Sequence, residues 1–398
     1  MNKTEQKNLE GNIHKICLMN FFDGMWFPGS VFVIFLLSNG MDLTQVGLIL
    51  AGSSIMPFFF DIPSSLWADK YSRKLMLALS WIAFLSMNAI YLFSNSFAMF
   101  FIAFCLNGVG TALSMGIFSA FVYDTLLSLG KEAQYEKTQS RVKKYYYAGR
   151  LSASVIGAYV YLLNPRMVFL LSTLASIICL ALVFLLKEPP REKSISKPFY
   201  QIREGLGFLL RHKITWYSIV IFSFIAGTSE LLFNYFQPVM KSADISVAYF
   251  GIIYFLSSAF SILGLVFYPK LSKCVHWQKI IFLYLLIALI TALIFSTSMQ
   301  FLIVVSIIVF SFFTSPQDVF ISNVINRIVP SSHRATALSI QAQIHLLFNS
   351  ILIVIISGIA DRTSIGFGMM LISVVIIFAS AVLLKLTNGK YGDGAVIN

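Results

Sequence analysis

Seven charged or titratable residues lie within the long apolar runs of this 398-residue sequence. They are Asp23, Asp61, Asp124, Arg150, Glu230, Asp318 and His345. A charged side chain at the centre of a lipid bilayer costs at least about 2.5–3.5 kcal/mol, so it faces a protein interior or a water-filled path. There it pairs with another group or carries an ion or a proton. These residues therefore offer acid–base chemistry inside a membrane.

Four of the carboxyl groups are candidates for proton uptake and release, at Asp23, Glu230, Asp61 and Asp318. Burial disfavours the charged form of a carboxyl group, so a buried one can exchange protons near neutral pH. At about 1.5 Å per residue, Asp23 lies near the middle of the first apolar run and Glu230 somewhat past the middle of the seventh. The alternative for each is a hydrogen-bonded residue of helix packing.

Two other charged residues lie at similar depth in neighbouring runs, Asp124 in the fourth and Arg150 in the fifth. We expect an ion pair between them, with a structural role; gating or coupling is the alternative. Histidine is the side chain that ordinarily exchanges protons near neutral pH, so His345 is also a candidate, although a lone histidine is compatible with a packing role.

The apolar runs have the composition of membrane spans. The sequence is 58% hydrophobic and 12% charged, against about a quarter charged in soluble domains. A spanning helix needs about 20 apolar residues, and the runs lack the alternation of a membrane β-barrel. The expected spans are 14–38, 44–67, 74–94, 98–127, 143–163, 166–187, 214–240, 246–268, 278–298, 300–324, 334–358 and 365–386. The sequence thus predicts an all-α membrane protein of twelve transmembrane helices.

Lysine and arginine are concentrated in alternate loops. With both termini placed in the cytoplasm, the outer loops hold only Arg166, Lys241 and Arg362, and the inner loops hold the other loop cations. Such a bias sets the orientation of membrane proteins. It also accounts for the net charge of +12, so no nucleic-acid partner is expected.

A long polar interruption divides the chain into two halves of six helices. The expected domains are an N-terminal half (1–187), a cytoplasmic linker (188–213) and a C-terminal half with a short cytoplasmic tail (214–398). Apolar residues recur at helical spacing from Phe199 to Leu210. This pattern predicts a short amphipathic helix on the inner membrane face; a plain linker is the alternative.

The loop after the second span reads LWADKYSRKLML, from Leu66 to Leu77. It resembles the signature of the major facilitator superfamily, with Ser65 and Ser72 where that family prefers glycine. Its charged positions are Asp69, Lys70, Arg73 and Lys74. The resemblance implies a cytoplasmic gating motif that helps to lock the outward-open state. Charges that only set topology are the alternative, but they leave Asp69 unexplained.

Other stretches resemble a bacterial, drug-efflux-like branch of this superfamily. They are DIP at 61–63, VYDTLLSLGKEAQYEK at 122–137, NRIVPSSHRATALS at 326–339 and, more weakly, NYFQP at 234–238. Two features depart from the pattern. Phe104 stands where the family often has an arginine, and the fifth span has Gly157 alone where drug antiporters have a glycine- and proline-rich stretch.

The resemblance implies a central cavity lined by the first and seventh helices, which makes Asp23 and Glu230 the better coupling candidates. The cavity-lining candidates are Phe22, Trp26, Asn234, Tyr235, Gln341 and His345. Aromatic rings suit amphiphilic or aromatic substrates and can bind a cation through their faces. Rings that face lipid or pack between helices are the alternative.

The resemblance implies a secondary transporter in the bacterial cytoplasmic (inner) membrane, with two halves that alternate access to a midplane site. We expect a proton-coupled antiporter that exports small amphipathic compounds such as drugs or natural products, as in multidrug-resistance efflux. The missing antiporter stretch motivates an alternative, a proton-coupled uptake permease for a nutrient such as a sugar or a peptide. A non-transporting membrane receptor is a further alternative, less favoured because no sizeable soluble domain is present.

No enzymatic activity, cofactor or metal site is expected. No glycine-rich stretch ends in Gly-Lys-Ser or Gly-Lys-Thr, and the four cysteines lack metal-ligand spacing. The expected partners are one small-molecule substrate, protons (sodium is the alternative ion) and the lipid bilayer. The protein is expected to be a monomer.

Overall fold

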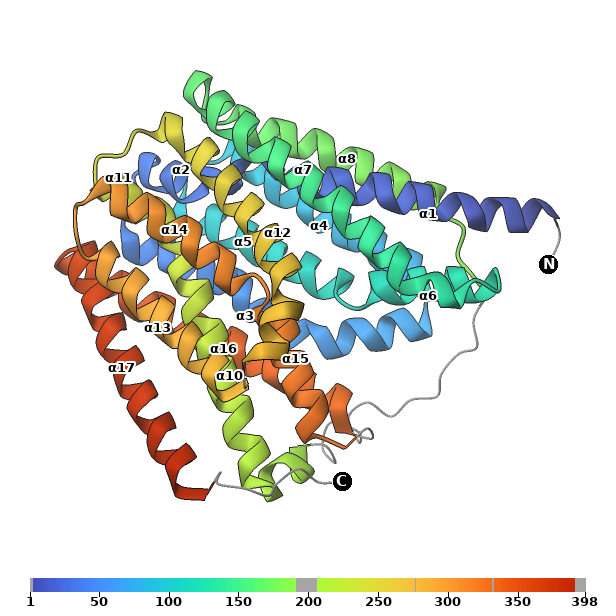
Figure 1. The fold of residues 1–398 in the computed structure, drawn as a ribbon. Helices are drawn as coiled ribbons and strands as arrows, with labels where there is room; N and C mark the ends of the chain where they lie inside the picture. Colours follow the sequence, from blue (N-terminus) through green and yellow to red (C-terminus); the bar gives the residue numbers. More distant parts are fainter. Residues whose placement is uncertain (1–2, 191–205, 276, 331–332, 391–398) are drawn as a thin grey trace. The chain divides into compact units, whose positions relative to one another are not determined.

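The computed structural model describes residues 3–190, 206–275, 277–330 and 333–390, and every regular element in these ranges is a helix (Figure 1). The first six expected spans coincide with α1 (Lys3–Gly24), η1 (Phe27–Ser30) and α2 (Phe32–Ser38); α3 (Leu43–Lys70); α4 (Arg73–Phe93); α5 (Phe97–Ser114) and α6 (Ile117–Ser128); α7 (Tyr135–Leu163), preceded by η2 (Glu132–Gln134); and α8 (Met167–Leu185). The fold is therefore all-α, as the sequence predicts.

The second six spans also match the helices. They coincide with α10 (Lys213–Asn234) and α11 (Phe236–Ser242); η3 (Val247–Tyr249) and α12 (Phe250–Cys274); α13 (Trp277–Phe295); α14 (Gln300–Thr314) and α15 (Gln317–Ile328); α16 (Arg334–Arg362); and α17 (Ile365–Lys390). Nine spans in the described ranges are long and apolar enough to cross a membrane, and the first span is a tenth if its bend of 43° is included. The fifth span, α7, is 29 residues long, but its tyrosines, serines and Arg150 make it less apolar.

The chain divides into two compact units. Unit 1 comprises Met1–Asn39, Gly52–Ser196 and Val247–Phe255, and unit 2 comprises Gly40–Ala51, Lys197–Ser246 and Leu256–Asn398. The main division falls inside the expected linker at 188–213. The amphipathic helix expected from Phe199 to Leu210 lies mostly outside the described residues, which resume at 206.

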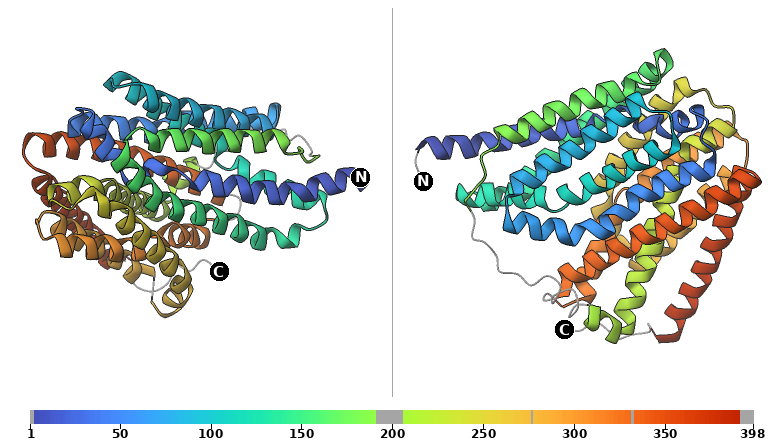
Figure 2. Two further views of the ribbon diagram at one scale, coloured as in Figure 1. Left: turned by 90° about the horizontal axis from the view of Figure 1, so that it is seen from above. Right: turned by 180° about the vertical axis from the view of Figure 1, so that it is seen from behind.

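Within unit 1, α4 packs against α5 and α8, and α1 packs against α7 and α8. The helices of this unit, coloured blue to green, run side by side in both views of Figure 2. Within unit 2, α10 packs against α16, and α13 packs against α14 and α17. The first and fifth spans of each half are thus neighbours in both units, as expected for a fold built from two parallel repeats.

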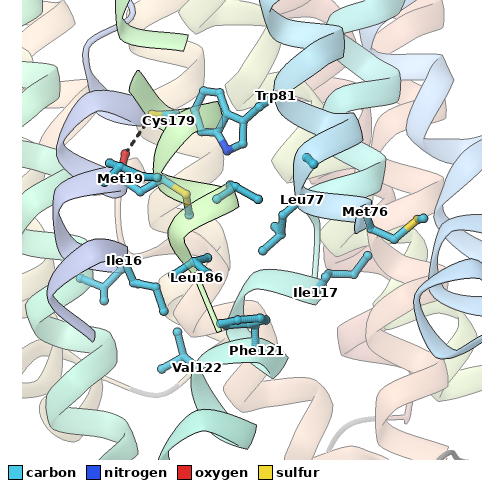
Figure 3. Close-up of a cluster of buried hydrophobic side chains, with 14 of the residues drawn as sticks. Ile16, Met19, Met76, Leu77, Trp81, Ile117, Phe121, Val122, Cys179 and Leu186 are labelled. Atoms are coloured by element: carbon cyan, nitrogen blue, oxygen red, sulfur yellow. Dashed lines mark hydrogen bonds between the residues drawn. The ribbon is translucent and has the colours of Figure 1, made fainter. Parts of the chain in front are cut away.

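A buried apolar cluster joins helices of unit 1, α1, α4, α6 and α8 among them (Figure 3). Met19 of α1, Leu77 and Trp81 of α4, Phe121 of α6 and Cys179 of α8 meet there, and Phe121 is only 1% exposed. Lipid chains are as apolar as these side chains, so burial from water does not drive this association. Close van der Waals packing between the helices holds the cluster together.

Glycines bring the backbones of α1 and α7 into contact. A Cβ atom at Gly149 would stand 2.0 Å from the carbonyl oxygen of Phe21, and one at Gly24 would stand 2.1 Å from that of Tyr146. Small residues permit this close approach between membrane helices. The contact fixes the position of Asp23, which lies between Phe21 and Gly24 in the last turn of α1.

Candidate functional site

An acid–base pair joins α10 and α16 within unit 2. His345 Nε2 lies 2.7 Å from Glu230 Oε2, and the two side chains are 23% and 35% exposed, respectively. The contact is an ion pair when the imidazole is protonated. Both residues were expected to have roles in transport, but the sequence did not predict that they pair.

The position of this pair follows from the polar faces of two helices. Ser223 Oγ donates a hydrogen bond of 3.0 Å to the carbonyl oxygen of Gln341, about two turns before Glu230 on α10 and one turn before His345 on α16. Between these contacts, a Cβ atom at Gly227 would stand 3.5 Å from the carbonyl oxygen of His345. Ser223, Gly227 and Glu230 are spaced by four and three residues, so they share one face of α10.

The pair lies well inside the membrane-spanning part of unit 2. At about 1.5 Å per residue, Glu230 is about 22 Å from Thr215, where the apolar span begins, and about 18 Å from Ser242, where α11 ends. The hydrocarbon core of a bilayer is about 30 Å thick. A net charge on this pair would therefore lie within the hydrocarbon core, where water is scarce unless the protein provides a path for water.

A second group of polar residues surrounds the end of α1 in unit 1. Asp23 is exposed there, and the α1 helix ends one residue later at Gly24. The Tyr146 side chain on α7 interacts electrostatically with Asp23 and forms a hydrogen bond with Arg150. The first span of each half thus carries a carboxylate, and the fifth span carries a basic residue close to it.

The expected ion pair between Asp124 and Arg150 is corrected by the structure. Asp124, on α6, instead forms an ion pair with Arg73 in the first turn of α4. The reason is the rotation of α7: a Cβ atom at Gly24 would stand 2.9 Å from the backbone nitrogen of Arg150. This part of α7 packs on α1, whereas α6 also packs on α4.

The expected gating motif is only partly described, because the side chains of Asp69 and Lys70 lie outside the described residues. Lys74 Nζ donates hydrogen bonds of 2.7 Å to the carbonyl oxygens of Phe184 and Leu186 at the end of α8. A cation at this position complements the negative end of the helix dipole. The Lys74 side chain is therefore held within unit 1.

An acidic residue stabilises the start of α4, just as the cation of Lys74 stabilises the end of α8. Glu188 accepts a hydrogen bond of 2.9 Å from the backbone N–H of Arg73 and one from the hydroxyl of Ser72, the N-cap residue of α4. A carboxylate complements the positive end of a helix and satisfies its free N–H groups. Arg73 therefore has two acidic partners, one for its backbone and one for its side chain.

The two remaining proton-coupling candidates, Asp318 and Asp61, lie on α15 and α3. Asp318 is exposed in the first turn of α15, where the helix dipole stabilises its charge. Asp61 is half-buried in α3, between Pro57 and Pro63. Neither residue takes part in the ion pair between Glu230 and His345.

The cavity-lining candidates differ in exposure. Tyr235 is buried and shares a hydrogen bond of 3.0 Å with Ser357 Oγ, so its hydroxyl serves the packing of unit 2. Gln341 is also buried. Phe22, Trp26 and Asn234 are half-buried, and the indole N–H of Trp26 is buried without a hydrogen-bond partner among the described residues.

One signal in the sequence could have revealed the polar face of α16. Gln341, His345 and Asn349 are spaced by four residues, which places them on one side of a helix. The pairing of His345 with Glu230 needed the structure, because the two residues are far apart in sequence. In the described ranges, no cluster of three or more His, Cys, Asp or Glu residues could hold a metal ion.

Comparisons with known proteins agree with the fold. Residues 16–342 match the family described as Major Facilitator Superfamily. The chain is 23% identical over 248 residues to the uncharacterized MFS-type transporter YxaM of Bacillus subtilis (strain 168), a match that spans 60% of this chain and 59% of that protein.

Solved structures of transporters have a similar fold. A mutant of the nucleoside transporter NupG gives a TM-score of 0.83 at 15% identity, covering 94% of this chain and 99% of that chain. The D-xylose-proton symporter gives a TM-score of 0.71 at 14% identity, covering 96% of this chain and 98% of that chain. At these identities the likeness concerns the fold alone. The family match covers most of the sequence, and the protein therefore belongs to the Major Facilitator Superfamily of membrane transporters.

Proposed function

We propose that this protein is a proton-coupled secondary transporter of a small organic solute, and that the Glu230–His345 pair binds the coupling proton. Family membership supports transport. The observation that supports proton coupling is the 2.7 Å contact between a carboxylate and an imidazole inside the membrane span. Asp23, at the corresponding span of the first half, is proposed as a second proton-binding residue.

The chemistry of the pair explains how protonation can depend on conformation. With one proton, the pair is neutral overall, whether that proton is on His345 or on Glu230. A second proton gives the pair a net charge of +1, and loss of the first gives −1. Either charge is costly at membrane depth, so proton exchange requires water or a compensating group. Alternating access supplies that contact with water from one side at a time.

We propose export of small amphipathic compounds as the first direction to test. It is supported by the resemblance of 122–137 and 326–339 to drug-efflux-like members of the superfamily. An antiporter exchanges the solute for a proton. In inverted vesicles with an acidic interior it would therefore accumulate the solute as protons leave.

Uptake of a nutrient is the second candidate, and two observations favour it. The fifth span has Gly157 alone where drug antiporters have a glycine- and proline-rich stretch. The transporters of similar fold include a nucleoside transporter and a D-xylose-proton symporter. A symporter would move the solute and the proton in the same direction across the same vesicles.

Purified protein in sealed liposomes with a pH-sensitive dye inside tests both candidates. Amphipathic dyes, nucleosides and pentoses are added one at a time, with potassium or sodium as the only other cation. We expect one class of solute to drive proton movement, opposite to the solute for export and parallel to it for uptake. Solute flux that follows a sodium gradient and leaves the internal pH unchanged would refute proton coupling.

A further inference from the structure

We propose that unit 2 carries a binding site for an anionic phospholipid, in a pocket between α12, α13 and the junction of α14 and α15. The pocket has a volume of about 370 Å³ and an almost entirely apolar lining. This volume is at the lower end of the range of ligand pockets, roughly 300–1,000 Å³. Its lining includes Phe267, Lys270, Leu283, Tyr284 and Phe313.

The pocket lies beside a tight contact between α12 and α14. Ser257 Oγ and Ser311 Oγ share a hydrogen bond of 2.7 Å, and Ser315 Oγ donates one of 2.7 Å to the carbonyl oxygen of Ser261. One turn further along, a Cβ atom at Gly264 would stand 1.9 Å from the carbonyl oxygen of Phe312. These contacts fix the two helices beside the pocket, which Gly264 and Phe312 both line.

The helix break beyond this contact leaves the space open. The α14 helix ends at Thr314 and α15 begins at Gln317, with Pro316 between them. Proline has no N–H group and interrupts the helical hydrogen bonds. Gly264 and Pro316 both line the pocket, so the pocket follows directly from the tight contact and the break.

An apolar, exposed face of α12 adjoins the pocket, and Phe267 belongs to both. Leu263, Val266 and Phe267 are 43%, 65% and 51% exposed, respectively. Val266 and Phe267 follow Leu263 by three and four residues, along a helix that is apolar enough to span a membrane. A hydrocarbon chain is the natural neighbour of such a face. The tail of the proposed ligand is therefore an acyl chain.

Three lysines supply the charge for the head group. Lys270 lines the pocket, and its Nζ lies 6.0 Å from the centroid of the Phe267 ring. Lys273 lies at the end of α12, and Lys279 comes just before Ile280, which also lines the pocket. All three lysines are exposed. The carboxylate of Asp318 interacts electrostatically with Tyr284, which lines the pocket, so three lysines and one carboxylate lie on the elements around the site.

The geometry fits one molecule that has both an apolar and an anionic part. Gly264 and Lys270 are six residues apart on α12, so the pocket extends about 9 Å along the helix from the level of the lysines. A lipid phosphate at that level would meet the ammonium groups while an acyl chain fills the apolar space. Basic pockets between membrane helices recognise anionic head groups in this way. The site lacks Glu230 and His345, so it does not depend on the proposed proton binding.

The test is retention of lipid by the purified full-length protein. Detergent-solubilised protein is incubated with equal amounts of dioleoyl phosphatidylglycerol and dioleoyl phosphatidylcholine, and bound lipid is counted by native mass spectrometry. We expect the wild type to retain phosphatidylglycerol preferentially. Replacement of Lys270→Gln is expected to lower this retention about fivefold, the effect of one lysine near an anionic membrane surface.

Two further variants separate the pocket from general charge. Leu283→Trp fills the apolar space and leaves every lysine in place, so we expect loss of retained phosphatidylglycerol. Lys241→Gln is the matched control, because Lys241 is an exposed lysine in the last turn of α11 and does not line the pocket. Its retention should equal that of the wild type. Elution from size-exclusion chromatography checks that each variant is folded.

Several results would overturn the proposal. Equal retention of both lipids would indicate an annular lipid without a specific site. Retention that falls equally in the Lys270 and Lys241 variants would indicate attraction by overall charge alone. Equal thermal stabilisation by soluble glycerol phosphate, which has the head group but no acyl chain, would indicate a simple anion site. Unchanged retention in both pocket variants would place the lipid elsewhere.

Discussion

Substitution of Gly149→Ala tests the contact that positions Asp23. The added Cβ atom would stand 2.0 Å from the carbonyl oxygen of Phe21, whereas ordinary contact begins at 3.4 Å. The α1 and α7 backbones must therefore separate by 3.4 minus 2.0, or 1.4 Å, at this point. Overpacking of this kind costs about 1–3 kcal/mol, and the clash involves two backbones that cannot change rotamer.

The expected result is a lower midpoint of thermal unfolding, measured on protein in detergent micelles, together with slower transport. Transport should slow because Asp23 follows Phe21 by two residues and moves with it, away from Tyr146. The matched control is Gly358→Ala in α16, where the added Cβ atom would find only Thr44 Oγ1, at 4.0 Å. Equal midpoints and equal transport rates for the two variants would refute the close contact between α1 and α7.

Three further predictions concern helix ends and topology. Arg73→Gln leaves the Asp124 carboxylate, which is 15% exposed, without its partner, so the free energy of unfolding in micelles should fall by about 3 kcal/mol. The double variant with Asp124→Asn should recover part of that loss, and strictly additive losses would argue against the pair. Lys74→Met removes two hydrogen bonds to the end of α8 and should cost about 1.5 kcal/mol, whereas an unchanged unfolding midpoint would argue against this cap. Tags at the two termini should both be protected from protease in intact cells, and a tag digested from outside would contradict the proposed orientation.

The span pattern was predictable because it depends on composition alone. Each of the twelve expected segments coincides with a helix or a run of helices. The breaks within spans were not predicted: 98–127 looked continuous, but α5 ends at Ser114 and α6 begins at Ile117. Hydropathy measures how well a segment fits lipid, and it does not report a local change in backbone direction.

The side-chain pairs were harder to predict than the depth of each residue. Asp124 and Arg150 have similar depth in neighbouring spans, but depth gives no information on helix rotation. The Asp124 carboxylate is directed to Arg73 instead. Glu230 and His345 were both identified as candidates, and their pairing depends on contact between α10 and α16, which sequence periodicity cannot establish.

The role of the Glu230–His345 pair is tested most directly by comparing net transport with exchange in liposomes. Glu230→Gln and His345→Gln should each abolish solute movement driven by a pH gradient, because the pair can no longer bind the coupling proton. Exchange of labelled for unlabelled solute, which needs no net proton movement, should continue in both variants. Glu10→Gln, which neutralises an exposed carboxylate paired with Lys131, should leave both activities unchanged. Proton-driven transport at the wild-type rate in Glu230→Gln and His345→Gln would contradict the proposed role of the pair.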